Sequence, residues 1–156
     1  MRNKLIKLTA LVGVAGILLM GCGGKGGNTS VDVNALTTSL TQDITYSEPL
    51  QELAAEDIEN YVLLEEGVEA VMYMSSGSTA EEVAVFTAPD ETTANTMKEN
   101  VTMFLDDQRA SFKDYIPEEA SRIDNAVLVV NGNYVVLCVS GDSEAAQDII
   151  DKAFNN

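Results

Sequence analysis

The polar and apolar positions between residues 68 and 88 follow the two-residue period of a β-strand. Residues 68–75 alternate, so that every second side chain lies on the same side of an extended chain. The turn-forming tripeptide Ser76-Gly77-Ser78 comes next, and a second short apolar segment spans residues 83–88. This order predicts two strands that pair as an antiparallel hairpin.

A second hairpin is predicted near the C-terminus, where residues 126–130 and 134–140 are almost wholly apolar. They flank Asn131-Gly132-Asn133, and Asn-Gly is a strong signal for a tight hairpin whichever two of these residues form the loop. One face is expected to carry Ala126, Leu128, Val130, Val135, Leu137 and Val139. The other is expected to carry Val127, Val129, Tyr134, Val136 and Cys138. Because both faces are apolar, we expect helices on both sides, or a second protein on one of them.

Three segments show the spacing of amphipathic helices. Asp32 is expected to cap the first, which runs to about Asp43, and Asp142 is expected to cap the last. The longest is opened by Pro89-Asp90-Glu91, is about 20 residues long and ends before Pro117. Its apolar stripe contains Ala94, Met97, Val101, Phe104, Leu105, Gln108 and Phe112. A shorter helix is expected over residues 55–61.

These elements predict an α+β fold with a four-stranded, mostly antiparallel sheet. Two hairpins joined by the long helix form the sheet, and the N- and C-terminal helices pack on it. We expect residues 31–156 to form this single domain, because 156 residues suffice for one domain only.

The first thirty residues have the features of an export signal. Arg2, Lys4 and Lys7 precede an uncharged segment, residues 8–20, which is shorter than the roughly 20 residues of a membrane-spanning helix. Leu19-Met20-Gly21-Cys22 resembles the lipobox of bacterial lipoproteins, which implies cleavage between Gly21 and Cys22 and acylation of the Cys22 thiol. The alternative is an ordinary secretory signal with an incidental cysteine. Residues 1–21 are thus the predicted signal peptide, and 22–30 a glycine-rich tether.

Composition and charge narrow the possible chemistry. The chain has no histidine, which removes the imidazole base, the histidine-ligated metal site and the Ser-His and Cys-His nucleophiles. It has 25 acidic and 9 basic side chains, and the 72 residues between Lys25 and Lys98 contain 14 carboxylates and no Lys or Arg. Such a surface repels nucleic acid and favours cations or a basic partner, or it is a solvated acidic surface without a partner.

The remaining candidate groups do not form a catalytic or metal-binding pattern. Cys138 lies in an apolar segment without a cationic neighbour and is expected to be a small buried hydrophobe. The acidic doublets are Glu65 and Glu66, Glu81 and Glu82, Asp106 and Asp107, and Glu118 and Glu119. Adjacent residues on a helix or strand point apart, so a doublet is a poor candidate for a shared site. We therefore expect no catalytic residue, metal or cofactor.

Three segments carry a resemblance to a known family: residues 71–86, Asp114-Tyr115-Ile116-Pro117-Glu118 and Asn131-Gly132-Asn133-Tyr134-Val135. They resemble an uncharacterised family of small lipoproteins found mainly in Gram-positive anaerobes, catalogued as domain of unknown function number forty-three fifty-eight. The resemblance covers most of the chain from Val31 onward. It implies export and a lipid anchor, and it brings no activity, ligand or catalytic residue with it.

The expected function is that of a non-catalytic binding or accessory module, anchored to the outer face of the cytoplasmic membrane through Cys22. Its partner would be a cell-wall component, a basic protein or a transporter subunit rather than nucleic acid. Two alternatives stay open. One is a structural homo-oligomer, such as a homodimer, that closes an apolar sheet face on a second copy. The other is a hydrolase that uses a pair of carboxylates.

Overall fold

The computed structural model describes residues 30–155 of the chain. The predicted signal peptide, the Gly21–Cys22 cleavage site and all of the tether except Ser30 lie outside the described residues. The helices are α1 (Val33–Gln42), α2 (Ala55–Ile58), α3 (Glu91–Phe112), α4 (Pro117–Asp124) and α5 (Ser143–Asn155). The strands are β1 (Gln51–Glu52), β2 (Glu69–Met74), β3 (Glu82–Thr87), β4 (Val127–Asn131) and β5 (Tyr134–Val139).

The strands form one antiparallel sheet in the order β1-β2-β3-β5-β4. Both predicted hairpins are present, and β3 pairs with β5 to join them into one sheet. The prediction of four strands was wrong, because β1 adds a fifth at the edge, where Gln51 pairs with Met74 and Glu52 with Tyr73. A strand of two exposed residues has no periodicity that a sequence pattern could reveal.

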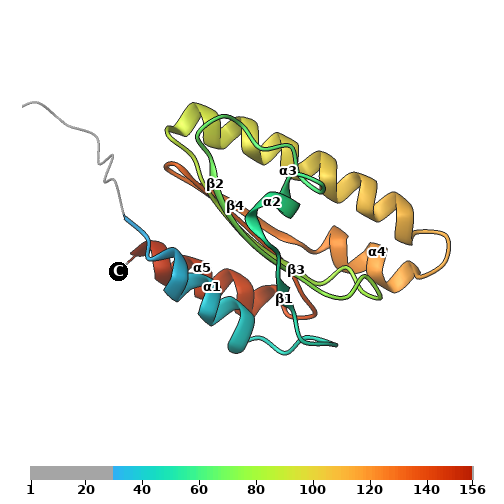
Figure 1. Ribbon diagram of the computed structural model, residues 1–156. Helices are drawn as coiled ribbons and strands as arrows, with labels where there is room; N and C mark the ends of the chain where they lie inside the picture. Colours follow the sequence, from blue (N-terminus) through green and yellow to red (C-terminus); the bar gives the residue numbers. More distant parts are fainter. Residues whose placement is uncertain (1–29, 156) are drawn as a thin grey trace, which may run out of the picture.

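Helices of the same chain cover both faces of the sheet (Figure 1). Helices α2, α3 and α4 lie on one face, and α1 and α5 lie side by side on the other. The sequence left two ways of covering the apolar hairpin, helices on both sides or a second protein on one side. The structure shows helices on both sides. The predicted facing of β4 and β5 is also confirmed, since Leu137 belongs to the core under α3 and Cys138 to the core under α1 and α5.

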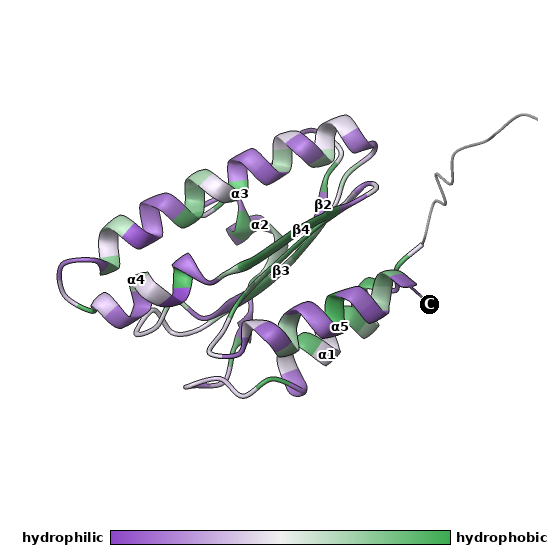
Figure 2. Cartoon of the chain, turned by 180° about the vertical axis from the view of Figure 1, so that it is seen from behind, coloured by the Kyte–Doolittle hydropathy of each residue, from purple (hydrophilic) through white to green (hydrophobic). Residues whose placement is uncertain are grey.

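The sheet is the apolar centre of a three-layer arrangement, and each helix turns its apolar side towards it (Figure 2). Phe86, Met97 and Leu137 are fully buried in the core between the sheet and α3. Leu40 and Ile150 are fully buried in the core on the opposite side. Burial of apolar area in both layers stabilises the domain without a disulfide, since the described Cys138 is a free thiol.

The helix caps follow the sequence prediction, whereas the segment after the long helix does not. The side chain of Asp32 accepts a hydrogen bond from the Ala35 amide, and that of Asp142 accepts one from the Ala145 amide. The long helix ends at Phe112, and a separate helix, α4, begins at Pro117. Proline suits the first position of a helix, where no intrahelical amide bond is required, so Pro117 starts α4 as well as ending the segment before it.

Among residues 30–155, no helix combines the length and the hydropathy needed to cross a membrane.

Candidate functional site

The doublet Glu81-Glu82 lies at the point where β3 begins with Glu82, and its two side chains bind different partners. Glu82 faces α3 and is fully buried, and its Oε2 accepts a hydrogen bond of 3.2 Å from Nε2 of Gln108. Burial raises the pKa of Glu82 to about 8, and the Gln108 hydrogen bond opposes this shift in part. Glu82 is therefore a neutral, protonated acid at neutral pH.

The Glu82–Gln108 pair leaves two polar atoms without a partner. Oε1 of Glu82 and Oε1 of Gln108 are both buried and accept no hydrogen bond within the described part of the chain. A buried acceptor without a donor is destabilising, and proteins rarely keep one unless water, an ion or a ligand completes it. Sequence reasoning placed Gln108 in the apolar stripe of the long helix. The signal in the sequence was a polar residue within an otherwise apolar stripe, which indicates that its side chain has a polar partner in the core.

Glu81, the residue before β3, is 2% exposed and binds three other segments. It accepts hydrogen bonds from the backbone amide and the hydroxyl of Ser47, and from the hydroxyl of Thr79. Its Oε1 lies 3.4 Å from Nη1 of Arg122 on α4. The same Nη1 donates to both carboxylate oxygens of Glu119 at 2.7 and 2.8 Å.

Glu119 also accepts a hydrogen bond of 2.8 Å from the backbone amide of Ala80. The structure thus brings together Glu81 and Glu119, one member from each of two doublets, around one arginine. Sequence reasoning missed this cluster because α4, which supplies Glu119 and Arg122, was not among the expected elements. The cluster is a structural ion pair that fixes α4 against the start of β3.

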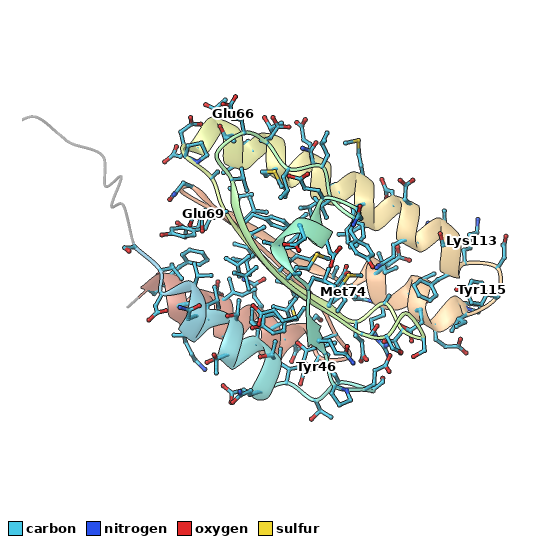
Figure 3. The ribbon with its side chains drawn as sticks, viewed as in Figure 1. Tyr46, Glu66, Glu69, Met74, Lys113 and Tyr115 are labelled. Atoms are coloured by element: carbon cyan, nitrogen blue, oxygen red, sulfur yellow. The ribbon has the colours of Figure 1, made fainter. Side chains whose placement is uncertain are left out.

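The other doublets form no comparable site. Asn100 donates a hydrogen bond of 3.0 Å to Glu65, whereas its neighbour Glu66 is exposed. Figure 3 shows Glu66 and Glu69 at one end of the molecule, far from Lys113 and Tyr115 at the other end. Within residues 30–155, no group of three or more acidic or cysteine side chains is arranged to hold a metal ion.

The turn between β2 and β3, residues 75–81, is held in place by carboxylates from distant segments. The backbone amide and hydroxyl of Ser76 and the hydroxyl of Ser78 donate to the carboxylate of Glu48, and these hydrogen bonds lower the pKa of Glu48. Gly77 has a φ of +96°, a conformation that favours glycine. Together with the Ala80–Glu119 contact, these bonds give the turn one defined conformation.

This turn forms one wall of a pocket of about 350 Å³ between α2, α3 and the end of β2. The size falls at the lower end of the range of small-molecule sites, about 300–1,000 Å³. The pocket is lined by Asn60, Tyr61, Met74, Ser75, Gly77, Thr79, Phe104, Asp107, Gln108, Ser111 and Phe112. Figure 3 places Met74 on the α2 side of the sheet and Tyr46 on the α1 side. Gln108 connects the pocket to the buried Glu82.

A larger hollow, of about 480 Å³, lies between α1 and α5. Its lining includes Leu36, Ile149 and Ala153. Neither of the two unpartnered buried side-chain atoms of the described residues belongs to this lining. The pocket beside α3 is therefore the stronger candidate for a ligand site, although it is smaller.

The four large apolar side chains that are exposed in the described chain also lie on the side of α2 and α3. They are Tyr61, Leu63, Met103 and Tyr115. Tyr61 is 47% exposed and lines the pocket, and the ring of Tyr115 stacks on that of Phe112 at 5.8 Å. Exposed aromatic side chains around a pocket are typical of a binding site rather than of a solvated surface.

Cys138 is buried, as predicted, in the core beneath α1 and α5. Its Sγ lies 3.6 Å from the hydroxyl oxygen of Tyr46, which is also 2.8 Å from the Leu40 carbonyl oxygen and donates to it. Burial raises the pKa of the Cys138 thiol, so the reactive thiolate is disfavoured. Cys138 therefore contributes packing and no evident chemistry.

The fold and the site define an α+β domain with helices on both sheet faces and a mixed polar and apolar pocket beside α3. Residues 42–140 match the family model described as "Domain of unknown function (DUF4358)", and they make up more than half of the chain. The chain belongs to this family, which confirms the resemblance noted in the sequence. Neither a curated protein nor a solved structure matched the chain. The family description assigns no activity, so functional argument rests on the residues.

Proposed function

We propose that this protein is an extracytoplasmic lipoprotein that serves as a non-catalytic binding module. Acylated Cys22 would hold it on the outer face of the cytoplasmic membrane, and the pocket beside α3 would bind its ligand. The observation that carries the binding role is this pocket. It combines apolar walls, polar groups and a lining residue, Gln108, whose buried Oε1 has no hydrogen-bond partner.

The sequence of the first thirty residues supports the anchor. The basic start, the short apolar segment and the lipobox-like Leu19-Met20-Gly21-Cys22 occur in the order found in exported lipoproteins. Two acyl chains provide stable membrane attachment, whereas one gives only marginal binding. Only the eight residues 23–30 separate Cys22 from residue 31, where the predicted domain begins, so the domain would stay close to the lipid surface.

The buried carboxylates support a binding role over the alternative of a hydrolase. A carboxylate pair of the glycosidase type needs both groups to reach the substrate. Glu81 and Glu119 are bound to Ser47, Ala80 and Arg122 inside the fold. Glu82 has the raised pKa of a general acid, but its carboxyl group is fully buried behind Gln108.

Membrane attachment is tested by labelling cells with radioactive palmitate and comparing two cysteine variants. We expect Cys22→Ala to lose the label and to remain uncleaved. Cys138→Ala is the matched control, because Cys138 is buried in the core, and it should keep both label and membrane partitioning. Equal labelling of the wild type and Cys22→Ala, or protein recovered uncleaved from the cytosol, would contradict the anchor.

The binding role is tested by placing a photo-crosslinking amino acid at single positions of the full-length protein in cells. Tyr61 lines the pocket, and Glu144 is an exposed residue of α5 on the opposite side of the sheet. We expect crosslinked species from position 61 that are missing from position 144. Identical patterns at the two positions would show that the pocket is not a preferred contact surface.

A further inference from the structure

Three of the four hydroxyl groups that line the pocket, those of Ser75, Thr79 and Ser111, have already donated their protons to the protein. The hydroxyl of Ser75 donates to the Thr79 carbonyl oxygen at 2.7 Å, and that of Ser111 to the Asp107 carbonyl oxygen at 3.0 Å. The Thr79 hydroxyl donates to Glu81 at 3.2 Å. A hydroxyl has one proton and two lone pairs, so these three groups offer only acceptor sites to a ligand.

The side-chain amide of Gln108 likewise offers an acceptor to a ligand. Its Nε2 donates to Glu82, and its Oε1 is buried and unpartnered. Oε1 of Glu82 is also unpartnered, but this neutral acid carries its own proton and does not line the pocket. The Gln108 oxygen is the acceptor that requires a donor, and the described protein supplies none.

The pocket also carries negative charge that no lining residue compensates. Asp107 contributes a carboxylate, and the lining contains no Lys or Arg. Arg109, on the same helix, is bound to Asp124 of α4. The formal net charge of the whole chain is −16, which repels anions and attracts cations towards the pocket.

The remaining walls are apolar and partly aromatic: Tyr61, Met74, Phe104 and Phe112. Such walls bury an aliphatic chain, and the faces of aromatic rings attract a cation. A fully polar ligand would leave these walls unused. A quaternary ammonium would fit the charge and the rings but has no N–H group for the unpartnered oxygen of Gln108.

We propose that this pocket binds a primary ammonium group carried on an unbranched alkyl stem. The ammonium donates its three protons to acceptors such as Gln108 Oε1 and the carboxylate of Asp107, and the stem packs against Met74 and the phenylalanine rings. This assignment rests on the proposed function, because it names the ligand chemistry of the same pocket. Free alkylamines and lysine side chains share this chemistry.

The test uses the full-length protein, purified in a neutral detergent, and isothermal titration at low ionic strength. n-Pentylammonium is compared with 1-pentanol, which has the same stem and a neutral head group. We expect the amine to bind at least about tenfold more tightly, because charge-assisted hydrogen bonds exceed neutral ones. Equal affinities, or no measurable binding of the amine, would overturn the proposal.

Two matched variants separate direct contact from the general field of the acidic protein. Asp107→Asn and Asp106→Asn remove the same charge from neighbouring positions of α3, but only Asp107 lines the pocket. We expect Asp107→Asn to weaken n-pentylammonium binding by about tenfold and Asp106→Asn by less than about twofold. Equal losses would mean that the amine responds to net charge alone, and the site would be rejected.

Gln108→Met keeps the length of the side chain and removes the acceptor. It should weaken the amine by about tenfold while leaving 1-pentanol binding unchanged. Thermal unfolding of each variant confirms that the fold is intact. If Gln108→Met fails to fold, Ser111→Ala removes another acceptor of the lining and should also weaken the amine. Unchanged amine affinity in the variant that folds would overturn the proposal that the acceptors of this pocket hold the ammonium group.

A final comparison distinguishes the two sources of the ammonium. Nα-acetyl-lysine methylamide presents the same head group on a peptide backbone. Binding equal to that of n-pentylammonium favours a lysine of a partner protein, and markedly weaker binding favours a free amine. Failure of both amines overturns the ammonium assignment, whereas crosslinking at Tyr61 and palmitate labelling at Cys22 test the proposed function independently.

Discussion

Glu82 and Gln108 meet across the interface between β3 and α3 through a single hydrogen bond. Gln108 Nε2 donates to Glu82 Oε2 at 3.2 Å, and Oε1 of Glu82 and Oε1 of Gln108 are buried without a partner. The burial of Glu82 raises its pKa to about 8. This pair therefore makes the stability of the fold sensitive to pH, and it places an unsatisfied acceptor at the pocket.

The first prediction concerns this pH dependence. In the unfolded protein, Glu82 ionises near its ordinary pKa of 4.5. In the folded protein, its pKa is about 8, so it keeps its proton up to about that pH. Between these two pKa values the folded state binds more protons than the unfolded state. The contribution of Glu82 to the free energy of unfolding therefore falls by up to roughly 1.4 kcal/mol per pH unit as the pH rises. Urea unfolding should show Glu82→Gln gaining stability relative to the wild type from about pH 5 to about pH 8.

Glu48→Gln is the matched control for that series. Hydrogen bonds from Ser76 and Ser78 lower the pKa of Glu48, so its stabilising contribution is lost only as the pH falls below 4.5. Relative to the wild type, this variant should show no slope between about pH 5 and about pH 8. A pH-independent difference for Glu82→Gln would show that the buried carboxyl group is not protonated in the folded state.

The second prediction compares two arginines that each bind a carboxylate. Arg122 is 20% exposed and serves Glu81 and Glu119, which are almost fully buried. Arg122→Met leaves both carboxylates without their cation, and we expect a loss of roughly 2–4 kcal/mol in the free energy of unfolding. We expect a smaller loss of stability than for a fully buried ion pair, because solvent reaches the guanidinium group of Arg122.

Arg109→Met is the control for Arg122→Met. Arg109 and Asp124 also link α3 to α4, but both side chains are largely exposed, so their ion pair is screened by water. Denaturant unfolding should show a change near the error of the measurement. If the two variants lost equal stability, burial of the Glu81–Glu119 cluster would not be the reason for its contribution.

The third prediction concerns the β4–β5 turn. Asn131 pairs with Tyr134, so the loop is Gly132-Asn133, and Gly132 has a φ of +57°. This is the position of a type II′ turn that glycine occupies. Gly132→Ala should cost roughly 1–2 kcal/mol of stability, because a Cβ is unfavourable at this φ.

Gly141→Ala provides the comparison for the turn. A Cβ at Gly141 meets no atom within 4 Å, and its φ does not lie in the positive region. Alanine there reduces the entropy of the unfolded chain, so thermal unfolding should show no loss of stability. A similar loss in both variants would point to a general effect of side chains in these loops rather than to backbone conformation.

The fourth prediction concerns the reactivity of Cys138. Burial and a raised pKa disfavour its thiolate, so a maleimide should label it slowly in the folded protein and rapidly in about 6 M guanidinium chloride. The Cys22→Ala chain leaves this thiol as the only cysteine. Equal labelling rates in the two conditions would show that the core between the sheet and α1 opens readily.

The sequence alone predicted those elements whose determinants are local. The second hairpin could be predicted because Asn131-Gly132-Asn133 marks the turn and the two-residue period sets the facing of both strands. Asp32 and Asp142 marked two helix starts through the short-range geometry of capping. Strand β1 has two residues, and α4 has eight, so neither contains enough periods for a pattern to emerge.

The acidic doublets show where local reasoning ended. It was right that Glu81 and Glu82 do not share a site, since Glu81 binds Ser47 and Glu82 binds Gln108. It could not place Glu119 beside Glu81, because that contact depends on how α4 packs against the β2–β3 turn. The partnership of Glu82 with Gln108 likewise depends on the position of α3 over the sheet.

The chain itself determined the absence of histidine chemistry, the strong negative charge, the two hairpins and the lipobox-like N-terminus, since composition, short periods and adjacent residues set these properties. Only the tertiary structure decided that helices cover both sheet faces, that Arg122 joins two carboxylates, and that Gln108 brings an unpartnered oxygen to a pocket. These features arise from contacts between segments distant in sequence. Their energies depend on burial and relative orientation, which no local pattern specifies.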